Sequence, residues 1–395
     1  MRKVTVLFLV LVSHISVAQF SLNQGDVDRK DYFISLPYEN IAGKIIIPVT
    51  INSHPYRFLL DTGSPVVLSQ ELYELLKPSV IKRVSLTDQS GKKDSSGLVM
   101  LEKVTLGDVT FTNTPSIISD NPYIFSCLKI NGIVGSNLLR NSIVQFSSRT
   151  KTVIITNDNR KLTVNKKRSS PLLLDDSQST PIISVLLQSS RTGKNVREEV
   201  VFDSGDDNFY VLALKHFKPF QQYQVFDTVA QGFGATSYGF NGLAEDTIDY
   251  RLAVKNITIN NANFINARLN TTLDENSRIG STIIDYGVVT LDYKNKLFYF
   301  DPFVATSDLK AETADFNVSP GFEDGKIVIG VIWDPTLRKT LKHGEEVISI
   351  NGILCDTIEP CDILTRNTPF VHETKLTLKV RHENGEVSDL VIFKE

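Results

Sequence analysis

Residues 58–69 read "FLLDTGSPVVLS", in which a single aspartate, Asp61, stands between two apolar runs. A charged group within an apolar strand is costly to bury unless it is paired or strongly hydrogen bonded. Asp61 therefore needs a partner or a chemical task, and the rest of the sequence has to supply it.

A second copy of this stretch occurs in the other half of the chain, as "EEVVFDSGDDNFYVLA" at residues 198–213. In each copy a glycine-flanked apolar segment follows, "GIVGSNLL" (132–139) in the first and "RIGSTII" (278–284) in the second. The offset between the copies is 142 residues from Asp61 to Asp203 and 145 residues from Gly135 to Gly280. A repeat at a nearly constant offset indicates a duplicated structural unit.

Each copy consists mainly of short segments rich in Val, Ile, Phe and Thr that are separated by turn-forming residues, which predicts β-strands. We therefore expect a mainly β protein with two similar lobes, at residues 30–156 and 179–303, and a cleft between them. A polar, charged linker is expected at 157–178. The repeat stops near residue 315, which predicts a third, smaller unit at 315–395.

The duplication would bring the two Asp-Thr/Ser-Gly loops face to face, so the partner of Asp61 becomes Asp203. Two carboxyl groups within hydrogen-bonding range cannot both ionise cheaply, and they share one proton. Such a pair can take a proton from water and give a proton to a carbonyl oxygen. The glycines permit tight turns, and the hydroxyls can bond across to the opposite loop. The residues expected to support the pair are Thr62, Gly63, Ser64, Ser204, Gly205 and Asp206.

These motifs resemble the pepsin-like and retropepsin-like aspartic proteases over roughly residues 35–303. The resemblance implies two closed β-barrel lobes, an endopeptidase that acts on peptides or proteins, and Asp61 and Asp203 as its catalytic residues. It also implies a β-hairpin flap over the substrate, from segment 86–101 or 232–242. The candidate flap residues are Ser96, Gly97, Phe233, Gly234, Tyr238 and Phe240.

Two departures from that family bear on activity. Asp206 follows Gly205, where the family usually has Ser or Thr. One interpretation is that it adds a carboxylate beside the pair and favours proton sharing at less acid pH. The other is that it lies in a surface turn that points away from the pair. Arg278 stands where an apolar residue is usual, so the strand behind Asp203 is expected to be modified or partly exposed. A catalytically inactive, protease-like protein that binds polypeptides is therefore the alternative function.

The last 80 or so residues contain "HGEEVISINGI" (343–353), which resembles a strand and turn of PDZ domains. The resemblance implies a small α+β domain with a peptide ligand, although "SPGF" (319–322) is only the nearest candidate for a carboxylate-binding loop. No histidine spacing suits a metal ion, and no phosphate-binding glycine loop occurs, so no metal or cofactor is expected.

The first residues, "MRKVTVLFLVLVSHISVAQF" (1–20), predict a secretory signal peptide at 1–18 with cleavage after Ala18. The alternative is a membrane anchor, for which the apolar run is too short. We expect an exported, periplasmic or extracellular protein with no membrane span after signal removal. The net charge of −3 gives no basic surface for nucleic acid, and two complete lobes make a monomer the expectation.

Three cysteines remain after the predicted cleavage. Cys355 and Cys361 are close enough in sequence for a local disulfide in an oxidising compartment. Cys127 is expected to be a small buried apolar residue. An odd number leaves at least one thiol outside any intramolecular bridge.

Overall fold

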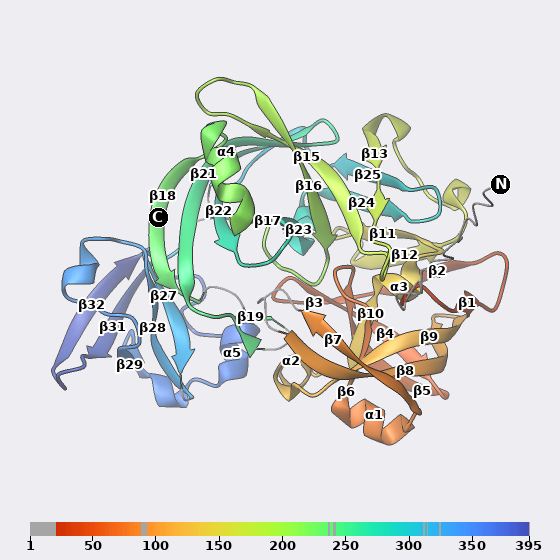
Figure 1. Cartoon of the computed structure of the whole chain (residues 1–395), viewed down its shortest axis with the longest axis horizontal. Helices are drawn as coiled ribbons and strands as arrows, with labels where there is room; N and C mark the ends of the chain where they lie inside the picture. Colours follow the sequence, from red (N-terminus) through yellow and green to blue (C-terminus); the bar gives the residue numbers. More distant parts are fainter. Residues whose placement is uncertain are drawn as a thin grey trace, which may run out of the picture.

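A computed structural model describes residues 21–87, 93–235, 238–239, 242–310, 313, 315–323 and 325–394. Figure 1 shows two β lobes, the first in orange and the second in green, with a smaller C-terminal domain in blue beside them. The prediction of a mainly β protein with two lobes is confirmed. The predicted signal peptide lies outside the described residues.

The first lobe is a nine-stranded sheet in the order β1-β9-β6-β10-β5-β4-β8-β7, with β3 beside β4, and a further pairing of β8 with β9 closes it. Its strands are β1 (Asp26–Val27), β3 (Glu39–Ile41), β4 (Lys44–Ile51), β5 (His54–Asp61), β6 (Val66–Ser69), β7 (Val80–Thr87), β8 (Lys93–Leu106), β9 (Val109–Ser119) and β10 (Gly132–Gly135). Its helices are α1 (Gln70–Leu76), α2 (Pro122–Leu128) and α3 (Ser136–Leu139).

The second lobe repeats this plan in the order β14-β15-β16-β23-β17-β22-β21-β18, with β26 beside β22, and a pairing of β15 with β21 closes it. Its strands are β14 (Leu173–Leu174), β15 (Pro181–Gln188), β16 (Asn195–Asp203), β17 (Tyr210–Ala213), β18 (Asp227–Gly234), β21 (Thr247–Ile259), β22 (Ala262–Thr272), β23 (Arg278–Gly280) and β26 (Thr306–Asp308). It also has the hairpin β19 (Tyr238–Gly239) and β20 (Gly242–Leu243), the helix α4 (Leu214–Gln222) and the 3-10 helix η3 (Ser281–Asp285).

A third sheet joins the lobes, in the order β13 (Ser169–Pro171), β25 (Leu297–Pro302), β24 (Gly287–Asp292), β11 (Ile143–Ser147), β12 (Thr152–Thr156) and β2 (Phe33–Pro37). The 145-residue offset makes Gln145 and Thr290 equivalent, and these two residues lie opposite each other in the β11–β24 pairing. The two copies are therefore related by an approximate twofold axis at this point. Segment 157–178, expected as a linker, contains η1 (Asn159–Lys161), η2 (Lys166–Arg168), β13 and β14.

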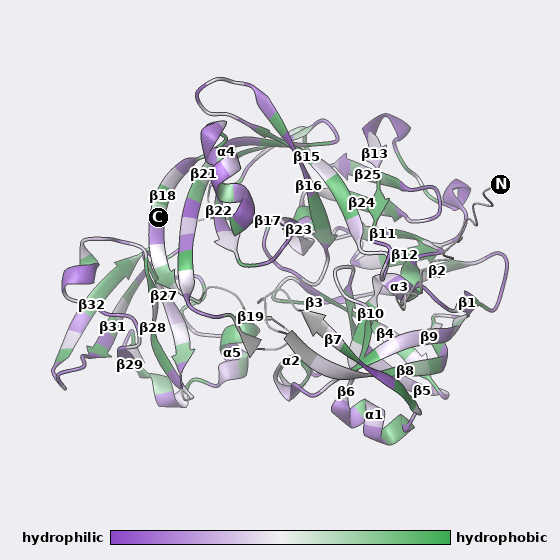
Figure 2. Cartoon of the chain, viewed as in Figure 1, coloured by the Kyte–Doolittle hydropathy of each residue, from purple (hydrophilic) through white to green (hydrophobic). Residues whose placement is uncertain are grey.

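Alternating apolar residues build the lobes, because successive side chains of a strand point to opposite faces. In β15, Ile183, Val185 and Leu187 are buried and their neighbours are half-buried. Figure 2 shows apolar stretches, in green, on β16 and β24. The ring of Phe202 lies 6.1 Å from that of Phe146 and 6.3 Å from that of Phe298, so the residue before Asp203 is fixed between the second lobe and the joining sheet.

The C-terminal domain has its own sheet, in the order β27-β28-β29-β31-β32 with β30 beside β29, and its own apolar core. Its strands are β27 (Val318–Glu323), β28 (Lys326–Ile332), β29 (Glu346–Ile350), β30 (Ile353–Leu354), β31 (Lys375–Arg381) and β32 (Val387–Phe393). It also contains α5 (Pro360–Leu364), η4 (Leu337–Lys339) and η5 (Cys355–Thr357).

This domain packs on the second lobe through Arg251 of β21. The Arg251 guanidinium donates to Asp315 Oδ2 and to the Phe316 carbonyl, at 2.6 Å each, and lies 4.2 Å from the centre of the Trp333 ring. The neighbouring strand β18 contacts β28, where a Cβ atom on Gly232 would overlap Val331. The domain is therefore held to the second lobe by ionic, cation–π and close backbone contacts.

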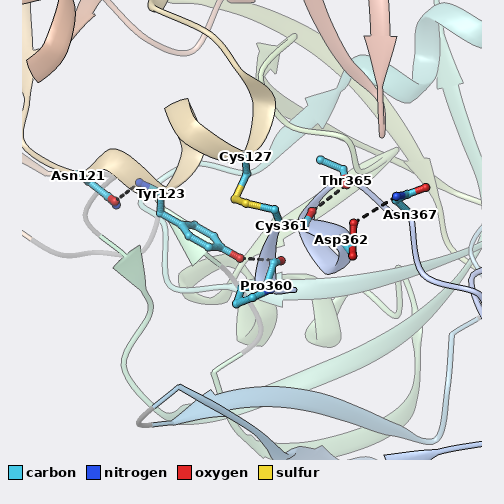
Figure 3. The surroundings of a disulfide bond; sticks show 8 residues. All are labelled: Asn121, Tyr123, Cys127, Pro360, Cys361, Asp362, Thr365 and Asn367. Atoms are coloured by element: carbon cyan, nitrogen blue, oxygen red, sulfur yellow. Dashed lines mark hydrogen bonds between the residues drawn. A yellow bond between two sulfur atoms is a disulfide. The ribbon is translucent and has the colours of Figure 1, made fainter. Parts of the chain in front are cut away.

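A disulfide joins the same domain to the first lobe, between Cys127 of α2 and Cys361 of α5 (Figure 3). The Tyr123 hydroxyl donates to the Pro360 carbonyl at 2.9 Å beside it. The Cys355–Cys361 bridge that the sequence left open is not formed: α5 brings Cys361 to α2 with the Cα atoms of Cys127 and Cys361 4.8 Å apart, and Cys355 is a free thiol. Cys127 is buried as expected, but as half of this bridge.

Candidate active site

Each aspartate of the pair ends a buried strand and is backed by a parallel strand. Gly135 of β10 lies opposite Asp61 of β5, and Gly280 of β23 lies opposite Asp203 of β16. Glycine is required at both backing positions, because a Cβ atom on Gly135 would overlap Pro65 and one on Gly280 would lie 2.5 Å from the Asp206 carbonyl. The motifs that follow each aspartate in sequence therefore form the floor of its loop.

The two Asp-Thr/Ser-Gly loops face each other across the joint between the lobes. A Cβ atom on Gly63 would lie 2.6 Å from the Asp203 carboxyl carbon, and one on Gly205 would overlap the Asp61 carboxyl. Each glycine N–H donates to the carboxylate of its own loop, at 2.8 Å from Gly63 to Asp61 Oδ1 and 2.9 Å from Gly205 to Asp203 Oδ1. Glycine at these positions thus lets the carboxyl groups meet and also orients them.

Thr62 and Ser204 lock the two loops together. Thr62 Oγ1 accepts from the Ser204 N–H at 3.0 Å and donates to the Phe202 carbonyl at 2.7 Å. Ser204 Oγ accepts from the Thr62 N–H at 3.1 Å and donates to the Leu60 carbonyl at 2.8 Å. All four bonds cross from one lobe to the other and both side chains are fully buried, so the relative position of the two aspartates is fixed.

The environment of the pair favours the retention of a proton. Burial raises the pKa of Asp61 well above its ordinary value, and the charge of Asp203 and a hydrogen bond to its side chain raise it further. One proton is therefore retained between the two carboxyl groups at pH values where an exposed aspartate is ionised. A pair that holds one proton has the base and the acid needed to add water to a carbonyl group.

Ser64 and Asp206 occupy equivalent positions after the two glycines. The Ser136 N–H donates to the Ser64 carbonyl at 2.9 Å, and the Ser281 N–H donates to the Asp206 carbonyl at 2.7 Å. The Asp206 side chain is only 11% exposed and lies beside the pair, so the surface-turn interpretation is wrong. Burial raises the pKa of Asp206, with Arg278 opposing this rise and Asp203 adding to it.

Arg278 is buried and contacts the pair directly, so the expectation of a partly exposed strand is wrong. Its Nη1 donates to Asp203 Oδ2 at 2.9 Å, and its Nη2 forms an ion pair with Asp274. The sequence contained a signal for this contact, since an arginine in a buried strand needs a carboxylate as much as Asp61 needed a partner. Which carboxylate Arg278 contacts depends on which strand lies beside the strand of Asp203, and the sequence alone does not give that pairing.

Lys44, Asp207 and Arg366 form a second charged group at the Asp203 loop that we did not predict. Lys44 Nζ donates to the Gly205 carbonyl at 2.7 Å and to Asp207 Oδ1 at 2.6 Å, while Arg366 of the C-terminal domain forms an ion pair with the other Asp207 oxygen. Burial would raise the pKa of Asp207, but Lys44 and Arg366 hold it below its ordinary value. The C-terminal domain therefore reaches the loop that carries the second aspartate.

The four candidate flap residues whose side chains the structure describes lie in two different environments. Ser96 and Gly97 belong to the β7–β8 hairpin but pack inward, because Ser96 is buried and a Cβ atom on Gly97 would lie 2.8 Å from Ile118. Phe233 and Gly234 of β18 meet the C-terminal domain, where the Phe233 ring lies 5.8 Å from that of His343 and Gly234 adjoins Gly330. The Tyr238 side chain and Phe240 lie outside the described residues.

Among the His, Cys, Asp and Glu side chains of the described residues, no group of three or more is placed to hold a metal ion. Among the helices of the same residues, none is long and apolar enough to cross a membrane.

Two closed β lobes with facing Asp-Thr/Ser-Gly loops form an aspartic-protease-like fold. The family model described as "Aspartyl protease" matches residues 47–138, which include Asp61 and the segment behind it. No curated protein matches the chain.

Some solved structures are similar to the chain at low sequence identity. An aspartic proteinase from Irpex lacteus shares 14% identity at a TM-score of 0.40, covering 69% of this chain and 98% of that one. A retropepsin-like aspartic protease from Rickettsia conorii shares 15% identity at a TM-score of 0.24, covering 34% of this chain and 94% of that one.

Proposed function

We propose that the chain is an aspartic endopeptidase in which Asp61 and Asp203 activate a water molecule to hydrolyse peptide bonds. The observation that carries the proposal is the pair itself: two carboxyl groups on facing loops, fixed by four hydrogen bonds between the lobes, that retain one proton. The ionised carboxyl takes a proton from the water while the protonated one gives a proton to the scissile carbonyl oxygen. Peptides or proteins are the substrates.

We further propose that the protein is exported, acts as a monomer in the periplasm or outside the cell, and uses its C-terminal domain as a PDZ-like unit for recruiting a substrate or partner. The Cys127–Cys361 disulfide supports export, because such bridges persist in oxidising compartments. The Arg366 contact with Asp207 supports a link between that domain and the site, since it joins the domain to the loop of Asp203.

One observation favours the alternative, a protease-like protein that binds polypeptides without cleaving them. The ion pair of Arg278 with Asp203 occupies a carboxylate oxygen of the pair that would otherwise be free to accept a hydrogen bond from a water molecule. In this case the site would bind extended peptides between the lobes and release them unchanged.

Incubation of the mature chain with a peptide library from about pH 3 to 8, followed by mass spectrometry of the new termini, separates the two functions. The proposal expects internal cleavage by the wild type and none by Asp61→Asn or Asp203→Asn. Asp108→Asn is the matched control, because Asp108 is exposed and pairs with Arg29. Peptides that are retained by the protein but remain intact at every pH would establish the binding function instead.

A further inference from the structure

Arg278 makes the two aspartates chemically different, although their loops are built alike. The 145-residue offset makes Ile133 its equivalent in the first copy, and Ile133 is buried in an apolar cluster. A buried cation therefore backs only one aspartate. Of the described cations, none lies within ion-pair distance of Asp61, although Lys44 acts on it from farther away.

The hydrogen bonds of Asp203 leave both of its oxygens facing donors. Oδ1 accepts from the Gly205 N–H and Oδ2 accepts from Arg278 Nη1. A guanidinium group can only donate, so the oxygen that faces it accepts and is best satisfied as a carboxylate. Asp61 receives the Gly63 N–H on Oδ1 and hydrogen bonds to Asp203. The donors are thus arranged for a charged Asp203 and a neutral Asp61.

We propose that Arg278 is a positioning residue that holds Asp203 as the ionised member of the pair and keeps the shared proton on Asp61. The inference rests on the proposed peptidase function and assigns its two roles. In the addition step, the water oxygen bonds to the carbonyl carbon as the carbonyl π bond opens, the proton of the water goes to Asp203 and the proton of Asp61 goes to the carbonyl oxygen, which gives a tetrahedral diol. In the second step, Asp61 takes back a proton from one diol hydroxyl as the C–N bond breaks, and Asp203 gives its proton to the leaving nitrogen. Charge is conserved and no further reactant is needed.

Arg278 shares its charge among several carboxylates, so removing Arg278 and removing one of the other carboxylates should have opposite effects on Asp203. Its guanidinium contacts Asp203 and Asp274 and lies 3.9 Å from Asp206. Removing Asp274 would leave more of the positive charge for Asp203, whereas removing Arg278 would leave the carboxylates uncompensated. The charged and titratable groups that face the pair are Lys44 of β4, Asp206 and Asp207 of the second loop, Asp274 before β23, Tyr293 after β24 and, through Asp207, Arg366.

The first test is the acid limb of kcat/KM against pH, which reports the ionisation of the free enzyme. Arg278→Met is expected to move this limb to higher pH by about one unit or more. Arg278→Lys keeps the positive charge and is expected to leave the limb close to its wild-type position. Asp274→Asn is expected to move the limb to lower pH. Arg197→Met is the matched control, because Arg197 is exposed on the strand that carries Asp203.

Shifts in the same direction for Arg278→Met and Asp274→Asn, or unchanged limbs in both, would overturn the proposal. If Arg278→Met does not fold, Asp274→Asn and Arg278→Lys still decide it.

The second test does not depend on turnover. Neutron diffraction from crystals of the deuterated wild-type protein is expected to place a deuteron on the Asp61 carboxyl and none on Asp203. A deuteron on Asp203 would overturn the role of Arg278. Absence of turnover in the wild type would refute the proposed peptidase function, while the deuteron position would still decide whether Arg278 fixes the charge of Asp203.

Discussion

Replacing Thr62 with valine tests whether the hydrogen bonds between the lobes hold the candidate site together. Valine keeps the shape of threonine but removes Oγ1, which accepts from the Ser204 N–H and donates to the Phe202 carbonyl. The Ser204 N–H is fully buried and loses its acceptor, which costs about 1–3 kcal/mol, and the lost bond to Phe202 adds about 1 kcal/mol. We expect the variant to be about 2–4 kcal/mol less stable.

Thr62→Ser is the matched control, because it keeps both hydrogen bonds and removes only a buried methyl group, at a cost of about 1 kcal/mol. The assay is urea denaturation followed by circular dichroism, since the one tryptophan, Trp333, lies where the C-terminal domain meets Arg251 of the second lobe and is not part of the two loops. Hydrogen exchange of peptides 58–69 and 198–213 should rise together in Thr62→Val. Equal stability of the valine and serine variants would refute the idea that these bonds fix the two loops.

Three further predictions concern the disulfide and the charges at the site. The double variant Cys127→Ser/Cys361→Ser should lose about 2–4 kcal/mol of its free energy of unfolding, because the bridge closes a separation of 234 residues. Cys355→Ser is the control, since Cys355 is a free thiol. Equal unfolding curves for the double variant and the control would contradict the prediction. Asp207 has a depressed pKa in the folded state, so its contribution to stability is present at neutral pH and is lost as the pH falls through the acid range. Urea titrations of Arg366→Met at a series of pH values should show a smaller loss of stability in acid. An unchanged pH dependence would count against the ion pair. Asp61 has a raised pKa, so its ionisation disfavours the folded state as the pH rises. Asp61→Asn should therefore be more stable than the wild type at neutral pH but not in acid. A variant less stable than the wild type at neutral pH would contradict the raised pKa of Asp61.

The fold was predictable because the duplication is visible in the chain. The near-constant offset of 142 to 145 residues predicted two similar β lobes, and the same offset places Gln145 opposite Thr290 where the copies meet. The facing of Asp61 and Asp203 could be inferred for the same reason, since equivalent strands of a duplicated unit end at equivalent places. Alternating apolar residues together with the repeat were sufficient to predict the two β lobes and the facing aspartates.

The contacts that distinguish the two lobes were not predictable in the same way. Cys361 pairs with Cys127 because the C-terminal domain packs beside the first lobe, whereas proximity in sequence favoured Cys355. Arg278 reaches Asp203 because β23 runs parallel beside β16, and sequence spacing alone does not determine which strands are neighbours. Phe233 had the features of a flap residue, but it lies against a domain whose position only the structure gives.

Steady-state kinetics on a cleaved peptide shows whether Asp61 and Asp203 together hydrolyse peptide bonds. We expect Asp61→Asn and Asp203→Asn each to lower kcat/KM by about 10²–10⁴-fold or more at every pH, and Asp108→Asn to leave it unchanged. Turnover by either aspartate variant at the wild-type rate would refute the role of the pair, as would a wild-type protein that cleaves no peptide at any pH.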